Sequence, residues 1–226
     1  MTAQPGTARP KQARSEETER RLLDAAEALI QEKGLADASI PEIVRRAGSS
    51  VGGFYARFPD KDALLHALED RFFADLEQRL ARLADAQRWA DAPLARIVEA
   101  CVHELVSVTR TRRNLIQAFL FRAAQNPEFH ADALHFRAHV AERLALLLAE
   151  RGDAVEHPDP ALAIDLGVQL AFGLMFQIVL TGDVRAGGRV LADAEIEREL
   201  CRNFERYVGA PGSDAAPSSP SPRRRR

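Results

Sequence analysis

The chain has 226 residues, of which 46% are hydrophobic and 28% charged, a balance that excludes a chain disordered throughout. Its formal net charge of −2 excludes a uniformly basic nucleic-acid coat, so any contact with nucleic acid has to lie on a local patch. The two cysteines, Cys101 and Cys201, exclude a disulfide-stapled secreted scaffold, and we expect no signal peptide because no apolar segment follows the first residues.

The two ends of the chain are more basic than its middle, and both lack the apolar residues that a folded segment buries. Residues 1–14 mix Pro, Gly and Gln with Arg and Lys, and residues 209–226 are rich in Pro, Ser and Ala before they end in Arg223–Arg226. Such compositions do not offset the entropy that is lost on ordering. We therefore expect a disordered basic arm over residues 1–14 and a disordered Pro/Ser/Arg tail over residues 209–226.

The first predicted helix runs from Glu16 to Lys33. Apolar residues recur along it at helical spacing, which places them on one inward face: Leu22, Leu23, Ala26, Leu29 and Ile30. Gly34 follows directly and ends the helix, because glycine readily adopts the left-handed conformation found at helix C-termini.

Two short helices follow, joined by a turn at Gly48. Ser39 and Glu42 form a candidate capping box for the first helix, and Ser49 or Ser50 caps the second. Two short helices joined by a glycine turn form a helix-turn-helix, whose second helix enters the DNA major groove with its N-terminal residues toward the bases. The same pattern is also typical of an ordinary helical hairpin, so at this point both interpretations stand.

The amino-acid sequence of this region resembles that of one family of regulators. Residues 39–65 read SIPEIVRRAGSSVGGFYARFPDKDALL, with an Ala-Gly turn, an aromatic recognition helix and the Lys-x-x-Leu-Leu start of the next helix. The preceding helix carries the matching run LDAAEALI at residues 23–30 and Lys-Gly at residues 33–34. In motif and spacing, about the first 70 residues resemble the tetracycline-repressor (TetR/AcrR) family.

This resemblance implies an all-helical homodimer that represses transcription and releases its DNA operator when a small molecule binds. It also implies a DNA-binding surface around the second short helix, made of Ser39, Ser49, Ser50, Val51, Gly52, Gly53, Tyr55, Arg57 and Lys61. Ser39, Ser50, Tyr55 and Lys61 lie where the family contacts the DNA backbone, and residues 51–53 lie where it approaches the bases. For Arg57 we expect either a polar contact or a contact with phosphate alone. Val51 and Gly53 replace polar residues that are common in the family, which leaves a thymine methyl and close backbone approach as ways to touch bases.

Residues 61–208 show helical spacing almost throughout, divided by Gly and Pro breaks. Period-two alternation is scarce and no Asn-Gly hairpin signal appears. We therefore predict an all-α chain of about nine helices and no sheet. A helix-turn-helix domain occupies residues 15–60, and a larger helical ligand-binding and dimerisation domain occupies residues 61–208.

Two helices near residues 160–181 and 193–208 are candidates for a homodimer interface. Both are apolar or amphipathic enough to need a partner, and they can pair with their copies as a four-helix bundle. Alternatively, the first is simply a central core helix. Its length and apolar character also fit a membrane span, but Asp165, Gln169 and Gln177 favour burial in protein, so we expect a cytoplasmic protein with no membrane partner.

The larger domain is rich in phenylalanine, which suits a pocket for an apolar or aromatic effector. Candidate pocket residues are Phe119, Phe172 and Phe176, with His103, Gln117, Arg122 and Gln169 as polar groups that orient the ligand. Each of these phenylalanines is equally consistent with plain hydrophobic core.

No motif for an enzyme, a cofactor or a metal is present in the sequence. It contains no GxSxG, no P-loop, no GxGxxG after a strand and no HExxH, and the histidines His130, His135 and His139 have no cysteine to join them. We therefore predict no enzyme activity, no cofactor and no metal site. The predicted function is a ligand-responsive, DNA-binding regulator; the alternative is a helical interaction or ligand-binding module whose helix-turn-helix no longer reads DNA.

Overall fold

The computed structural model describes residues 8–90, 92–124, 127–151 and 155–209. These residues form nine α-helices, one short 3₁₀ helix and one pair of two-residue strands, which confirms the all-α prediction. In chain order the elements are α1 (Ala8–Asp37), α2 (Ile40–Arg46), α3 (Val51–Tyr55), α4 (Lys61–Leu83), η1 (Ala86–Trp89), α5 (Leu94–Thr111), α6 (Arg113–Ala123), α7 (Pro127–Arg151), α8 (Pro160–Thr181), β1 (Arg185–Ala186), β2 (Arg189–Val190) and α9 (Asp193–Val208).

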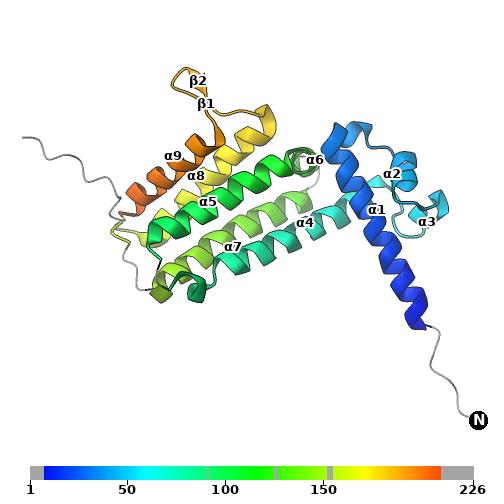
Figure 1. Cartoon of the computed structure of the whole chain (residues 1–226), viewed down its shortest axis with the longest axis horizontal. Coiled ribbons are helices and arrows are strands. Elements are labelled where there is room, and N and C mark those ends of the chain that lie inside the picture. The colour runs from blue at the N-terminus through cyan, green and yellow to red at the C-terminus, as the bar shows by residue number, and fades with distance from the viewer. Residues whose placement is uncertain (1–7, 91, 125–126, 152–154, 210–226) are drawn as a thin grey trace, which may run out of the picture.

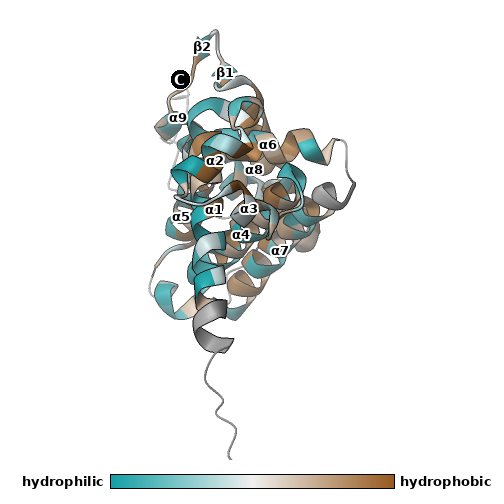
Figure 2. Cartoon of the chain, turned by 90° about the vertical axis from the view of Figure 1, so that its right-hand side faces the viewer, coloured by the Kyte–Doolittle hydropathy of each residue, from teal (hydrophilic) through white to brown (hydrophobic). Residues whose placement is uncertain are grey.

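The helices form two groups that meet at α6 (Figure 1). Helices α1–α3 lie at one end of the molecule, and the long helices α4, α5, α7, α8 and α9 lie side by side in a bundle at the other. Helix α4 leaves the first group and runs the length of the bundle, so it belongs to both. Seen from the side of α1–α3, hydrophilic residues dominate the projecting turns of α1 (Figure 2).

Two local predictions were wrong. The first helix begins at Ala8 rather than Glu16, so residues 8–14 of the expected disordered arm are helical, and residues 1–7 lie outside the described part. The segment contains Ala, Arg, Lys and Gln, which favour helix, and Pro10 lies in the first turn, where its missing amide costs nothing. The expected tail, beyond Gly209, also lies outside the described residues.

The second correction concerns the expectation of no sheet, because residues 185–190 form a small hairpin. Arg185 pairs with Val190 and Ala186 with Arg189 in antiparallel register. Gly187 and Gly188 form the turn with φ of +57° and +77°, the left-handed conformation that type I′ hairpin turns require at both central positions. The Gly-Gly pair is therefore a turn of its own rather than a simple break between helices.

The predicted inward faces are confirmed in the N-terminal group. All five apolar residues predicted for the first helix are buried, as are Phe54 and Phe58. Their cluster continues through Leu64, Leu65 and Leu68 of α4 into residues of α5 and α6. The core therefore crosses the expected domain boundary at residue 60 without interruption; the boundary itself stays a prediction.

A second cluster joins α5, α8 and α9. Helix α8 is long and apolar enough to cross a membrane by length and composition alone, but Ile164, Val168 and Ile178 are buried against the rest of the protein. It packs against α5, α6, α7 and α9, and its close approach to α9 depends on one small residue. A Cβ atom at Gly167 would lie 2.6 Å from Cδ2 of the Phe204 ring.

We expect Gly167→Ala to destabilise the protein, because the added methyl group overlaps the Phe204 ring. Overpacking of this kind costs about 1–3 kcal/mol, and each kcal/mol lowers the melting temperature of a chain of this size by about 2–4 °C. Thermal unfolding followed by circular dichroism measures the shift. In a Phe204→Leu background the same methyl group should cost little, and an equal loss in both backgrounds would show that the clash is not the cause.

Candidate nucleic-acid interface and ligand cavity

Helices α2 and α3 form the predicted helix-turn-helix. Gly48 makes the turn at φ +58°, and the amide of Ser49 then donates to the Val44 carbonyl at 3.0 Å. On the inner side Ile43, Val44 and Phe54 are buried in the cluster that includes α1. One face of each short helix is therefore fixed by packing, and the opposite face is left outward.

The two helix caps differ from each other. The Ser50 hydroxyl accepts a hydrogen bond from the Gly53 amide at 2.9 Å and so caps α3, as predicted. The capping box expected at Ser39 does not form, because its hydroxyl donates to Glu42 Oε2 at 2.9 Å instead of accepting an amide. Lys33 Nζ reaches the same oxygen at 2.6 Å. These bonds lower the pKa of Glu42 to about 2. Through its bond to Lys33, the Glu42 carboxylate joins α2 to the last turns of α1.

The outward face of α3 carries most of the predicted DNA-binding residues. Val51 and Tyr55 are each about half exposed, and Gly52 and the capping Ser50 are also exposed. The Tyr55 ring rests edge-on against Phe54, with ring centroids 5.3 Å apart, which fixes its direction and leaves the rest of the residue outward. This face combines hydroxyl groups, an apolar side chain and open backbone at a helix N-terminus.

Gly53 lies under the two serines of the turn. A Cβ atom there would lie 2.8 Å from Ser49 Oγ and 3.2 Å from Ser50 Oγ. The glycine therefore leaves room for both hydroxyl groups at the start of α3, a reason for its presence that is independent of base contacts.

Arg57 and Lys61 are engaged within the protein. The Arg57 guanidinium donates to the Ser15 carbonyl at 3.2 Å and to the Gly53 carbonyl at 2.9 Å, which ties α3 to α1. Lys61 Nζ donates to the Leu35 carbonyl at 2.6 Å, and its partial burial lowers the pKa of the ammonium group. Contacts of these two residues with phosphate stay predictions, whereas their bracing of the helix-turn-helix is a feature of the fold.

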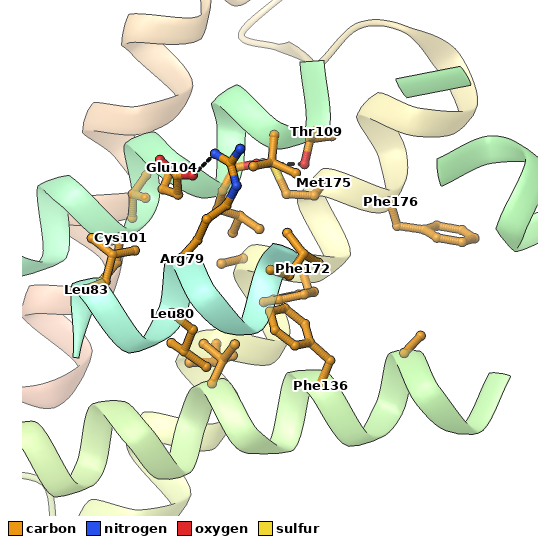
Figure 3. Close-up of a pocket in the computed structure, with 18 of the residues that line it drawn as sticks. Arg79, Leu80, Leu83, Cys101, Glu104, Thr109, Phe136, Phe172, Met175 and Phe176 are labelled. Carbon is orange, nitrogen blue, oxygen red and sulfur yellow. Dashed lines mark hydrogen bonds and ion pairs between the residues drawn. The ribbon is translucent and has the colours of Figure 1, made fainter. Parts of the chain in front are cut away.

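The second candidate site is a cavity of about 310 Å³ inside the helical bundle. Its walls are almost entirely apolar and come from α4, α5, α6, α7, α8 and α9. The three phenylalanines named as candidate pocket residues, Phe119, Phe172 and Phe176, are among the residues that line it, and their contact with a ligand stays a prediction. In Figure 3 Phe136 and Phe172 lie close together, whereas Phe176 points away from them.

A continuous run of aromatic contacts crosses the wall of the cavity. Phe119 packs on Phe72, Phe72 on Phe73, Phe73 on Phe136 and Phe136 on Phe172, with centroid distances of 5.5, 5.6, 5.8 and 6.4 Å. The run joins α6, α4, α7 and α8. Such a surface fits an apolar or aromatic molecule.

The structure places none of the four polar residues expected in the pocket among those lining the cavity. His103 is exposed and contacts Glu197 at 3.0 Å, and Gln117 and Gln169 are also exposed. Arg122 forms an ion pair with Asp62. The physical reason is helical phase, since these residues lie on turns whose inward positions are taken by apolar neighbours.

The polar residues that do line the cavity are Glu69, Arg79, Glu104, Thr109 and Asn203. Arg79 donates to Glu104 at 2.6 Å, as Figure 3 shows, and Thr109 donates to a backbone carbonyl at 2.8 Å. Glu69 is different. It is 2% exposed, its Oε2 atom has no hydrogen-bond partner, and burial raises the pKa of its carboxyl to about 8.

Sequence reasoning missed Glu69, although a signal was present. Its position falls at helical spacing, four residues after Leu65 and three before Phe72, two apolar residues that are buried in α4. A charged residue at such a position faces the core rather than solvent, and so marks either a buried pair or a binding group.

Metal binding finds no geometric support in the described residues, where no three His, Cys, Asp or Glu side chains gather. His139 Nδ1 instead contacts Glu77 at 3.0 Å, and the side chain of His130 lies outside the described part.

The raised pKa of Glu69 predicts a pH-dependent loss of stability. Between its ordinary pKa of 4.5 and about 8 the folded protein holds this proton and the unfolded chain releases it, so the stability due to the neutral carboxyl is lost as pH rises through this range. Glu69→Gln, which cannot ionise, should melt at a progressively higher temperature than the wild type between about pH 5 and pH 8.5. Asp37, an exposed acid at the end of α1 that is not among the charges acting on Glu69, supplies the control. Asp37→Asn should follow the wild-type profile, and an equal effect of both variants would exclude burial of Glu69 as the cause.

Comparison with known proteins adds two family matches. Residues 22–68 match the family of bacterial regulatory proteins named tetR, and residues 93–207 match the tetracyclin repressor-like C-terminal domain. The second match alone covers half of the chain.

Among curated relatives, the uncharacterized HTH-type transcriptional regulator YvdT of Bacillus subtilis is 33% identical over 98 residues, which cover 42% of this chain and 47% of that protein. The HTH-type transcriptional regulator AcrR of Shigella flexneri is 30% identical over 122 residues, or 52% and 54% of the two chains. EthR of Mycobacterium tuberculosis is 37% identical over 79 residues, or 35% of each. The chain thus spans about half of these relatives' length or less.

Solved structures give the same picture over a longer span. A regulator assigned to the TetR family from Mesorhizobium loti superposes with a TM-score of 0.68 at 21% identity, over 87% of this chain and 97% of that one. NalD of Pseudomonas aeruginosa, the secondary repressor of a multidrug efflux pump, superposes with a TM-score of 0.60 at 22% identity, over 85% and 97%. At these identities the likeness shows the fold.

Proposed function

The chain belongs to the tetR family of bacterial regulatory proteins and is a DNA-binding transcriptional regulator, and we propose that it is a cytoplasmic, homodimeric repressor released from DNA by a small molecule. The observation that carries the proposal is the outward face of α3, which is held rigidly by a packed inner face and has Ser50, Val51, Gly52 and Tyr55 turned to solvent. The relatives that match are regulators rather than enzymes.

In this proposal α3 enters the major groove. The amides and serine hydroxyls at its N-terminus face phosphate oxygens, since helix N-termini attract anions. Val51 meets a thymine methyl group and Gly52 lets the backbone approach the base edges. The Tyr55 hydroxyl donates to a phosphate, which fixes register without reading sequence.

Selection of random double-stranded DNA by the purified protein at moderate salt tests the DNA-binding proposal. We expect enrichment of a palindrome, because a two-fold dimer reads two half-sites about one helical turn apart. Sequences bound without a palindrome would contradict the dimeric arrangement. No enrichment would favour the alternative, a helical ligand-binding module whose helix-turn-helix no longer reads DNA.

On the selected operator, Tyr55→Phe should weaken binding by about tenfold or more, because a hydrogen bond to a charged group contributes about 1.5–3 kcal/mol. Tyr207→Phe is the matched control, since Tyr207 contacts His157 in the bundle, far along the chain from the helix-turn-helix. Fluorescence anisotropy with labelled operator measures both. Equal affinities for the wild type and the Tyr55 variant would remove Tyr55 from the interface.

The dimer proposal rests on the outward face of α8. Leu162, Leu170, Phe176 and Leu180 are each about half exposed there, at helical spacing, and Leu170 and Phe176 also border the cavity. Gly173 lies in the middle of this face, and nothing within 4 Å would meet a Cβ atom placed on it. An exposed apolar stripe with a small residue at its centre suits close packing against a second copy, with α9 completing a four-helix bundle.

We expect Gly173→Glu to convert the dimer into a folded monomer. The side chain has space in the isolated chain, and replacing glycine in a helix interior does not weaken the helix. A buried charge at the interface of two copies is costly, however. Sedimentation velocity gives the mass, and Leu146→Glu, at an exposed leucine of α7, is the control that should remain dimeric. A dimeric Gly173 variant would move the interface elsewhere.

Ligand response is proposed to act through α4. Its second half lines the cavity with Phe72, Phe73 and Leu76, and its first half packs under the helix-turn-helix with Leu64 and Leu65. A small apolar or aromatic effector that displaces α4 would therefore change the separation of the two recognition helices. A coupling of about 1–3 kcal/mol suffices for a 5–150-fold change in DNA affinity.

A further inference from the structure

The cavity contains one buried acid that the fold does not use. Glu69 of α4 lines the cavity and is 2% exposed, and its Oε2 atom has no hydrogen-bond partner. A buried polar atom without a partner is unfavourable, so an unsatisfied carboxyl oxygen in a ligand cavity marks a place where a hydrogen-bond donor of a ligand lowers the free energy.

The other acid in the wall does not offer such a place. Glu104 Oε1 is 2.6 Å from Arg79 Nη1, and Arg79 Nε is bound in turn to Asp75 at 2.9 Å. These charges are already paired. The cavity wall around Glu69 consists mainly of phenylalanine and leucine side chains. Phe72 and Phe73 lie one helical turn beyond Glu69 on α4.

We propose, on the basis of the function proposed above, that the effector is an amphiphilic amine, with an apolar or aromatic body against the phenylalanines and a protonated amino group on the Glu69 carboxylate. The amine supplies the missing donor and compensates the buried charge at the same time. A carboxylate ligand would instead be repelled by the ionised form of Glu69, increasingly so as pH rises, and a neutral hydrocarbon would leave Oε2 unsatisfied.

The charges around Glu69 set its pH behaviour. Asp70 of α4 and Asp132 of α7 raise the pKa of the carboxyl together with burial, whereas Arg122 of α6 lowers it, with a result of about 8. The unliganded carboxyl is therefore mostly neutral at pH 7. An ammonium group binds the ionised form, so binding expels the carboxyl proton to solvent, and the affinity rises with pH until the carboxyl is fully ionised. An alkylammonium group, with a pKa of about 10, keeps its charge throughout this range.

Three probes with one apolar body test the proposal: phenylbutylamine, phenylbutanol and phenylbutyrate. Isothermal titration of the free, full-length protein without DNA, at about pH 7 and pH 8.5 in two buffers of different ionisation enthalpy, gives affinity and proton release. We expect the amine to bind at least about tenfold more tightly than the alcohol, which is about 1.4 kcal/mol, the acid to bind most weakly, and the advantage of the amine to grow with pH.

Two variants assign the effect to one carboxyl. Glu69→Gln, checked for folding by circular dichroism, should reduce the amine and the alcohol to similar affinities and abolish proton release. Asp70→Asn removes the adjacent exposed charge and should keep the preference for the amine. An unchanged amine preference in the Glu69 variant, equal binding of the three probes, preference for the acid or no binding at all would each overturn the inference.

Operator binding, measured separately, keeps this inference apart from the proposed function. A protein that selects a palindrome but shows no preference for the amine contradicts only the ligand class. A protein that prefers the amine through Glu69 but selects no DNA supports the ligand class and contradicts the regulator.

Discussion

Burial of α1 is the constraint on which the rest of the structure depends. Its inward face packs against the helix-turn-helix and against α6 within one cluster, so that Leu22 and Phe54 share a core with Leu115 and Phe119. Gln31 reinforces the junction, because its side-chain oxygen accepts from the Leu115 amide at 2.9 Å and its carbonyl accepts from Asn114 at 2.8 Å. The first of these bonds satisfies a backbone amide in the first turn of α6 that has no partner within the helix. Helices α1–α3 are thus fixed to the bundle by packing and hydrogen bonds, in addition to the covalent chain.

A series of ion pairs connects the cavity wall to α1. Arg79, in the cavity wall, pairs with Asp75. Asp75 also pairs with Arg112 at 2.9 Å, and Arg112 lies 3.8 Å from Glu27 of α1. Glu27 is held in turn by Arg71 of α4. Half-exposed pairs of this kind contribute little stability each. These ion pairs nevertheless join α4 to α1 and to Arg112 at the end of α5. A shift of α4 therefore has to break or stretch contacts with the DNA-binding helices.

The sequence predicted what periodicity controls and missed what depends on contacts across elements. Leu22 and Ile30 were predicted to be buried, because helical spacing alone determines the side of the helix on which they lie. Arg57 and Lys61 were assigned to DNA from their motif positions, and no local pattern indicates that they reach carbonyls of Ser15 and Leu35. The Gly187–Gly188 turn was visible as a break, but whether two residues on each side pair as strands depends on their register.

For Glu69, periodicity and contacts between helices both matter. Its place on the apolar face of α4 can be predicted from the sequence, but its lack of a hydrogen-bond partner depends on where Arg79, Arg122 and Asp132 lie in the bundle. It follows Leu68, which belongs to the core shared with α1, and precedes Phe72, which lines the cavity. A change of charge at this position therefore acts on α4 where its packing passes from the DNA-binding end to the cavity. An unpaired buried charge costs far more free energy than a surface ion pair contributes. Ionisation of this one carboxyl therefore affects the position of α4 more than the surface ion pairs around it do.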